Sequence, residues 1–237
     1  LSQTDLSGAD LTGAVLKNIS AMRSRWRDAY LGEADLSDAD LAGADLTDAD
    51  VSDGSLARAM LTGARLKRAV LVGTDLSAAD LAEAYMVEAD LSRANLTGAQ
   101  MREANLSGAD LNGTKLMSSD LTQVKMAGAA LTQTDLTGAC LNSADLTESE
   151  WANATVEGTD FTRADLTGAD VQNTDFGSAT MTDAQLDDGI QGGVTIAEDI
   201  GIASVHVEDP QLAVNGSKIA VTWENPDRQG KPSLRIA

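Results

Sequence analysis

Residues 94–113 read ANLTGAQMREANLSGADLNG, four consecutive quintets built on one plan. Each quintet begins with Ala and has Leu or Met two residues later. A large apolar residue recurs at every fifth position from Leu1 to Leu186, in 37 of 38 places, and only Ala21 is small. In the series of every fifth residue from Thr4 to Gly189, two places before the large position, 36 of 38 are Ala, Gly, Ser or Thr. So strict a period over most of the chain predicts a repeat array.

A period of five fits neither a helix, with 3.6 residues per turn, nor a flat strand, with a period of two. Ala94 and Leu96 lie two residues apart, so a short extended stretch points both side chains inward and Asn95 outward. Thr97 and Gly98 are typical turn residues. We therefore expect the chain to turn a corner every five residues and to bury one large and one small side chain per quintet.

The quintets ANLTG at 94 and ANLSG at 104 resemble the pentapeptide-repeat family, whose pattern is A(D/N)LXX. The resemblance covers residues 1 to about 190. It implies an all-β fold, a right-handed quadrilateral β-helix with four quintets per coil, Leu stacked inside and Ala at the corners. At a coil separation of about 4.8 Å, 186 residues give about nine coils and a rod about 45 Å long.

The chain is strongly acidic, with 37 Asp and Glu against 17 Lys and Arg and a net charge of −20. Asp precedes the large apolar residue in 17 quintets. Quintets twenty residues apart share one side of a four-sided coil, which predicts an acidic stripe of Asp10, Asp50, Asp90, Asp110, Glu150 and Asp170. Phosphates repel such a surface, so direct nucleic-acid binding is excluded. An anionic rod that occupies the DNA-binding groove of a protein remains compatible with this charge.

Residues 17–30, KNISAMRSRWRDAY, keep the count of five but lose its composition. They form either a degenerate half coil or a ten-residue excursion from the rod. Arg23, Arg25, Trp26 and Arg27 make this the one basic, aromatic segment of the array. In relatives that act on topoisomerases, projecting loops contribute to activity, so these four residues are the candidate partner contact. The alternative is a coil distorted to hold Trp26 in the core.

The repeat stops at about residue 187, and residues 191–237 form a second region. Strand-like runs occupy 202–207, 212–214 and 218–223, and Asn215-Gly216 is a strong hairpin signal. A solenoid end needs a cover because it exposes an apolar cross-section. The tail is therefore a small β-rich cap or the beginning of a further β domain.

Candidate catalytic residues are scarce. His206 lies in the tail with no Cys or Asp at metal-ligand spacing, and Cys140 has no histidine partner in the repeats. Trp151, Phe161 and Phe176 replace Leu and are expected in the core. We expect no catalysis, cofactor or metal. No stretch approaches the 18 apolar residues of a membrane span, and the cytoplasm is the expected compartment.

Three functions remain open. The first is a non-catalytic acidic rod that binds a protein partner or serves as a scaffold. The second, implied by resemblance to quinolone-resistance and antibiotic self-immunity members, is a DNA mimic that binds a type II topoisomerase such as DNA gyrase. The third is a structural block that associates end to end. The second hypothesis departs from those relatives in one respect, because they dimerise through a C-terminal helix and the tail here is β-patterned.

Overall fold

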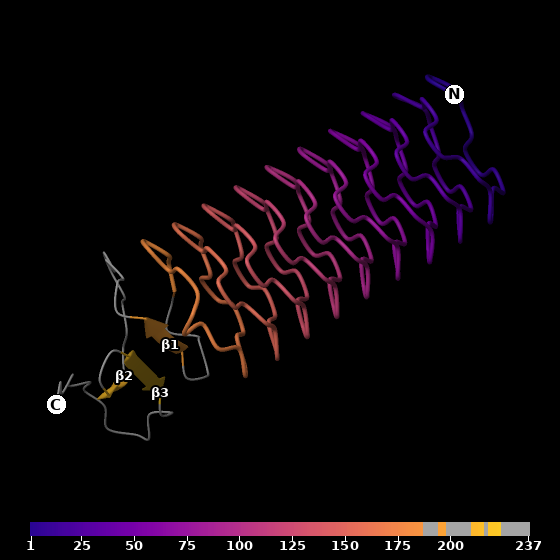
Figure 1. The fold of residues 1–237 in the computed structure, drawn as a ribbon. Helices are drawn as coiled ribbons and strands as arrows, with labels where there is room; N and C mark the ends of the chain where they lie inside the picture. Colours follow the sequence, from indigo (N-terminus) through magenta and orange to yellow (C-terminus); the bar gives the residue numbers. More distant parts are fainter. Residues whose placement is uncertain (187–193, 198–209, 216–217, 224–237) are drawn as a thin grey trace.

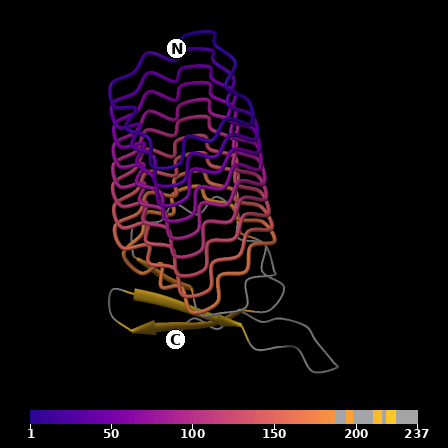
Figure 2. The same ribbon diagram turned by 90° about the vertical axis from the view of Figure 1, so that its right-hand side faces the viewer.

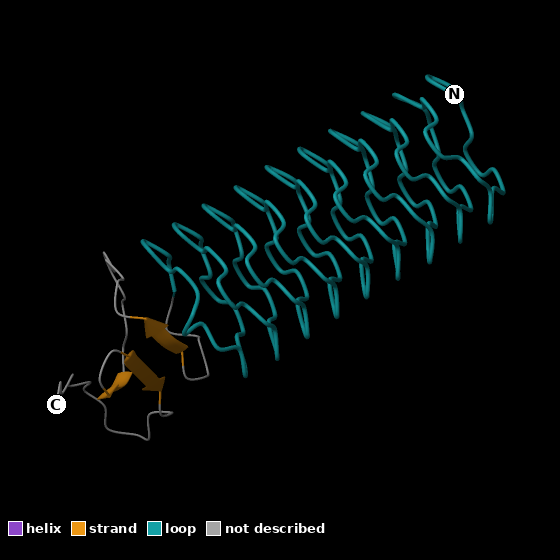
Figure 3. Cartoon of the chain, in the orientation of Figure 1, coloured by secondary structure: helices purple, strands orange, loops and turns teal. Residues whose placement is uncertain are grey.

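A computed structural model describes residues 1–186, 194–197, 210–215 and 218–223. Residues 1–186 form a column of stacked coils (Figure 1). The same coils lie one above another from the N-terminus onward in Figure 2. The column contains no regular helix or strand and is drawn as loop in Figure 3. The fold prediction is thereby confirmed at the level of a coiled β-bridge array, whereas named strands occur only in the tail.

Each coil takes twenty residues. The residue before the large apolar one forms a parallel β-bridge with the residue twenty positions later, as in Asp90↔Asp110 and Asn95↔Lys115. Four such ladders run along the column. We name the four sides by their quintets, which recur every twenty residues: side I begins with 19–23, side II with 4–8, side III with 9–13 and side IV with 14–18. Side III lies between sides II and IV and opposite side I.

Quintet 94–98 shows where its backbone N–H groups donate. The N–H of Ala94 closes a β-turn onto the carbonyl three residues earlier, at 2.9 Å. The N–H groups of Asn95, Leu96 and Gly98 donate to carbonyls of adjacent coils at 3.0, 2.7 and 2.9 Å. The fifth N–H, of Thr97, donates to the side chain of Asn95 at 3.2 Å. All five donors of the quintet are satisfied, as burial in a packed structure requires.

Aspartate has the same role as Asn95 throughout the column. All 17 Asp residues before the large apolar position accept a hydrogen bond through Oδ1 from the N–H two residues later. This is an Asx-turn, in which a short polar side chain replaces a backbone acceptor. The preference of this chain for Asp or Asn before Leu therefore has a structural cause, and these side chains are not freely solvated.

The third residue of each corner turn has positive φ almost everywhere, for example 69° at Gly98 and 54° at Ala78. A positive φ at the third turn residue alone defines a type II turn. Glycine fits this conformation without strain, whereas Ala78 adopts it at a steric cost.

The predicted core is confirmed. The large apolar residues from Trp26 to Met181 are buried, and the small residues of the quintets pack between them. Trp151, Phe161 and Phe176 lie inside the column, with ring centroids 5.7 and 5.4 Å apart along the series. Buried hydroxyls find carbonyl acceptors, as where Thr114 Oγ1 donates to the carbonyl of Leu91 at 2.7 Å. The interior is therefore packed and its polar groups are satisfied.

The excursion considered for residues 17–30 is wrong, because this segment is an ordinary part of the column. Arg25 bridges Asp5 and Asp45, and Tyr30 bridges Asp10 and Asp50. Trp26 is fully buried, and its Nε1 donates to Ser24 Oγ at 2.5 Å. Trp151 repeats the arrangement with Ser149 at 2.6 Å. A serine two residues before the tryptophan thus supplies the acceptor that a buried indole needs.

The tail contains strands β1 (Val194–Ala197), β2 (Pro210–Asn215) and β3 (Lys218–Trp223). They form an antiparallel sheet in the order β1-β3-β2. Asn215 pairs with Lys218, which confirms the predicted hairpin. β1 was not predicted, and the strand expected at 202–207 and His206 lie outside the described residues. A capping role for the tail stays a prediction.

The Asx-turn makes a testable prediction at Asp90, whose Oδ1 accepts from Ser92 N at 3.0 Å and Ser92 Oγ at 2.7 Å. Asp90→Asn should leave the free energy of unfolding nearly unchanged, because the amide oxygen still accepts. Asp90→Ala should cost about 1–2 kcal/mol through the lost hydrogen bonds. Denaturant unfolding checks this, and equal midpoints for the two variants contradict the assignment. Glu150→Ala is the control, since the Glu150 side chain makes no hydrogen bond among the described residues and only its backbone does.

Candidate functional site

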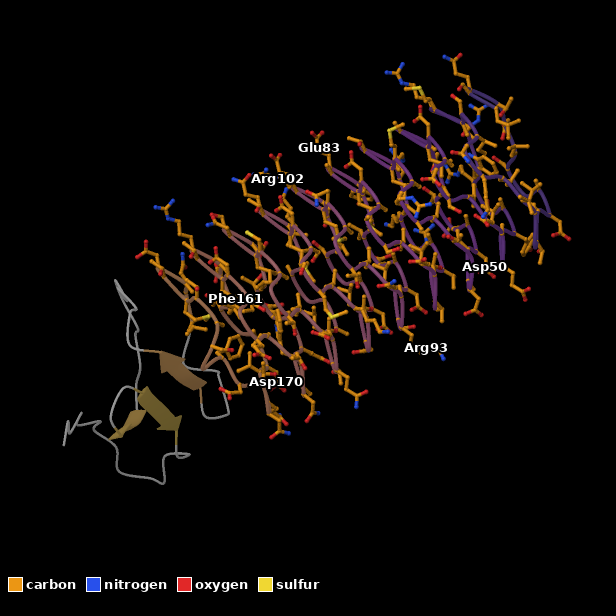
Figure 4. The ribbon with its side chains drawn as sticks, in the orientation of Figure 1. Asp50, Glu83, Arg93, Arg102, Phe161 and Asp170 are labelled. Atoms are coloured by element: carbon orange, nitrogen blue, oxygen red, sulfur yellow. The ribbon has the colours of Figure 1, made fainter. Side chains whose placement is uncertain are left out.

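Side III concentrates acidic residues along the column. The bridges of this ladder connect residues 10, 30, 50, 70, 90, 110, 130, 150 and 170 in one line. The predicted stripe residues therefore share one side, interrupted by Tyr30, Val70 and Ala130. Figure 4 shows Asp50 and Asp170 along one edge of the column and Glu83 and Arg102 along the opposite edge.

Two further acids and one base belong to this side. Glu33 and Asp53 occupy its corner turns, and Arg93 is its only basic residue. Side III thus holds eight acids and one base, whereas side II holds eight acids and six bases. The sequence prediction missed Glu33 and Asp53 because it followed only the position before the large apolar residue. The same twenty-residue spacing, applied to the corner positions, identifies them.

The five aspartates of the stripe are held in fixed orientations by the N–H two residues later, whereas the Glu150 carboxylate has no such hydrogen bond among the described residues. Asp10, Asp50 and Asp90 each accept through Oδ1 from the N–H and the hydroxyl of the Ser or Thr two residues later. Oδ2 is not used in these turns. The Thr12 hydroxyl and then its N–H, by donating to the Asp10 carboxylate, lower the pKa of Asp10 below its usual value. At these three positions side III therefore presents charged carboxylates whose Oδ2 remains open to a partner, whereas Oδ2 of Asp170 accepts from Gln172 Nε2 at 3.1 Å.

Ion pairs distinguish the sides. Among the described residues, none of the ion pairs within 4.0 Å includes an acid or base of side III. On side II, Arg25 pairs with Asp5 at 3.0 Å, Arg65 lies 4.0 Å from Asp45, and Arg68 pairs with Asp48 at 2.6 Å. The bases of side II are thus largely neutralised within the chain, while side III keeps its negative charge.

The candidate partner contact of Arg23, Arg25, Trp26 and Arg27 is only partly available. Trp26 cannot contact a partner because its side chain is buried in the core. Arg25 and Arg27 are exposed on side II, where Arg27 lies 3.7 Å from Asp45. Arg23 stands at the corner between sides I and II and packs over Gly43, where an added Cβ would lie 3.3 Å from Arg23 Cγ. The arginines form three separate contacts on a regular coil, so no projecting loop exists at this place.

The described residues offer little for covalent or metal chemistry. No group of three or more His, Cys, Asp or Glu side chains in this part of the chain is arranged to hold a metal ion. Cys140 is half-buried on side I, with its Sγ 3.4 Å from Thr122 Oγ1. What the column offers chemically is a rigid array of oriented carboxylates. No helix among the described residues has the length and apolar character of a membrane span.

The family model for pentapeptide repeats matches the chain in eight copies. The matched residues are 1–21, 27–63, 59–98, 74–113, 84–123, 114–150 and 152–187. Residues 22–26, which contain Trp26, fall between two matched ranges. No curated protein sequence is a significant match.

Two solved structures are similar to this chain. HetL, a pentapeptide repeat protein involved in heterocyst differentiation regulation in the cyanobacterium Nostoc sp. strain PCC 7120, is 32% identical over 80% of this chain and 87% of its own, with a TM-score of 0.39. QnrB1, a plasmid-mediated fluoroquinolone resistance protein, is 21% identical over 76% and 87%, with a TM-score of 0.51. The repeats, their number and the coil they form lead to one conclusion: the chain belongs to the pentapeptide-repeat family.

Proposed function

We propose that this chain is a non-catalytic binding rod whose side III contacts a basic surface of a protein partner. The observation that carries the proposal is the charge of side III, where eight acids accompany one base and none of them is in an ion pair among the described residues. Unpaired carboxylates on one side produce a field that attracts a basic partner and accelerates association.

The orientation of the carboxylates favours binding as well. Ordering a flexible acidic side chain at an interface costs rotamer entropy, about 0.5–1.5 kcal/mol per side chain. Asp50 and Asp90 are already held by two hydrogen bonds each within their turns. A partner therefore meets a preorganised set of acceptors at regular intervals of about 4.8 Å or its multiples along the column.

Direct nucleic-acid binding does not fit this surface, because phosphates and carboxylates repel each other. The described residues do not favour a catalytic function. They present many similar carboxylates on the outer surface of the column, and among them no general acid, general base and nucleophile lie together. Electrostatic binding of a basic protein partner is the function that uses the unpaired carboxylates of side III.

A type II topoisomerase is the second candidate partner. The repeats hold 29 acids and 13 bases, which gives about one net negative charge per 3 Å of axis, roughly half the linear density of duplex DNA. A column of this charge can compete for a DNA-binding groove. QnrB1, which has the same fold, is a plasmid-mediated fluoroquinolone resistance protein, and the resemblance to quinolone-resistance members is what suggests a topoisomerase as partner. At 21% identity the likeness to QnrB1 shows a shared fold.

Charge removal on opposite sides tests the main proposal. The side III variant carries Asp50→Asn, Asp90→Asn and Asp110→Asn, and the control carries Asp40→Asn, Asp80→Asn and Asp160→Asn on side I. Both change the net charge equally and keep the Asx-turns, so both should fold. Wild type and both variants are immobilised and exposed to an extract of the source organism. We expect the proteins captured by the wild type to be captured by the side I variant as well. The side III variant should fail to capture them. Equal capture by both variants contradicts the proposal.

A supercoiling assay tests the second candidate. With purified DNA gyrase and micromolar protein, we expect the wild type to lower supercoiling or to change fluoroquinolone sensitivity, and the side III variant to lose this effect. Raising the salt concentration should weaken the effect, because exposed charges are screened beyond about 8 Å at physiological ionic strength. Unchanged enzyme activity and drug sensitivity at every protein concentration exclude gyrase as the partner.

A further inference from the structure

The middle of side II carries little charge. Quintet 104–108 is Ala-Asn-Leu-Ser-Gly, and the quintets on either side of it along the ladder, 84–88 and 124–128, contain only Glu88 and Lys125 as charged residues. Tyr85 is 39% exposed there and forms a β-bridge with Asn105 of the next coil. A low-charge centre with an exposed tyrosine is typical of the core of a protein interface.

Opposite charges flank this centre at equal distances. Quintet 64–68 holds Arg65, Lys67 and Arg68, forty residues before 104–108, and quintet 144–148 holds Asp145 and Glu148, forty residues after it. Both therefore lie two coils from the centre. Asp145 and Glu148 are in no ion pair within 4.0 Å among the described residues. Arg65 is 62% exposed and reaches Asp45 only at 4.0 Å, whereas Lys67 lies 3.9 Å from Glu88 and Arg68 is paired with Asp48 at 2.6 Å. Arg65 is therefore the base of this flank that is most available to a second copy.

This arrangement is self-complementary under a two-fold rotation. An axis that lies in the plane of the interface and crosses side II at Asn105 brings a second copy face to face, with its column antiparallel. A residue a given number of coils before Asn105 in one copy then faces the residue the same number of coils after Asn105 in the other copy. Arg65 faces Asp145 of the copy, Arg68 faces Glu148, and Tyr85 faces Lys125, and each pair occurs twice.

We propose that side II is a self-association surface, through which two copies of this chain pack side by side and antiparallel about Asn105. Basic and acidic flanks meet, and the low-charge centre is buried.

The charge pattern also selects the register. Moving the axis one coil toward the C-terminus places Lys125 against Lys125 and Glu88 against the level of Asp165. Moving it one coil toward the N-terminus places the basic quintet 64–68 against the uncharged quintet 104–108. In the proposed register the next level outward brings Asp45 opposite Asp165, which limits the favourable contact to the five coils around Asn105. Like charges directly opposite each other disfavour the shift toward the C-terminus. The shift toward the N-terminus places Glu88 against Glu88 of the copy and leaves Arg65 and Arg68 without an acidic partner on the copy.

The geometry leaves the proposed partner surface free. Rotation about an axis that crosses side II from one edge to the other keeps side III of both copies on the same flank of the dimer. Two acidic sides then lie next to each other and form one broader acidic surface. Side III itself cannot be the self-association surface, since eight acids on each copy would repel.

Two matched cysteine variants test the contact. Asn105 and Asn95 have the same local role, each accepting from the N–H and hydroxyl two residues later, and both are half-buried. Asn95 lies on side IV, away from the proposed interface. In a Cys140→Ser background, Asn105→Cys should form a disulfide-linked dimer under copper-phenanthroline oxidation, because the two-fold axis brings residue 105 next to its copy. Asn95→Cys should not. Equal cross-linking of the two variants overturns the proposal.

Charge-reversal variants provide a second test of the proposed dimer contact. Arg65→Glu and Asp145→Lys should each raise the dimer dissociation constant about tenfold or more in sedimentation velocity, because each reversed pair occurs twice. Combining the two substitutions exchanges the charges and should restore association. Lys115→Glu and Asp135→Lys on side IV are the matched controls and should have little effect. If the combined variant unfolds at the wild-type temperature but does not dimerise, the proposed pairing is contradicted. A wild type that stays monomeric at every concentration contradicts it as well.

Discussion

Five backbone N–H groups per quintet need acceptors, and a chain that turns a corner every five residues cannot supply them from a helix or a long strand. In quintet 94–98 one N–H closes the turn, three donate to adjacent coils and the fifth donates to the side chain of Asn95. This last hydrogen bond is what Asp or Asn provides before the large apolar residue. Three of the five bonds exist only between stacked coils, so a single coil has no stable form and the column is cooperative along its length.

The same constraint produces the surface on which function depends. An aspartate that satisfies the fifth N–H through Oδ1 leaves Oδ2 outward, and 17 quintets use this solution. Structural need therefore makes the column acidic on every side. Selective binding requires that the sides differ in net charge, and this difference comes from the distribution of Lys and Arg. Side II carries six Lys and Arg, most of them paired with acids of adjacent coils, whereas side III carries Arg93 alone.

Much of the column could be predicted from the sequence. The unbroken period fixed which residues are buried, and the family resemblance supplied four sides, from which the stripe through Asp50, Asp90 and Asp110 followed. The burial of Trp26 could not be derived from the period, because a tryptophan side chain can lie either on the surface or in the core. The serine two residues earlier, repeated before Trp151, is the sequence signal that marks a buried indole. The hydrogen bonding of the aspartates depends on turn geometry, which composition does not reveal, and the ion pairs of side II depend on which side chains meet across a coil boundary.

Residue-resolved amide hydrogen exchange tests the backbone pattern most directly. We expect protection to recur with a period of five through residues 26–166, with the N–H after the large apolar residue protected where an Asp or Asn precedes it, as at Thr97, and exposed to exchange where Val70 or Lys115 precedes it, as at Val72 and Met117. Uniformly rapid exchange through the repeats, or continuous protection as in a helix, would contradict the stacked five-residue coil on which the surface and its proposed partners depend.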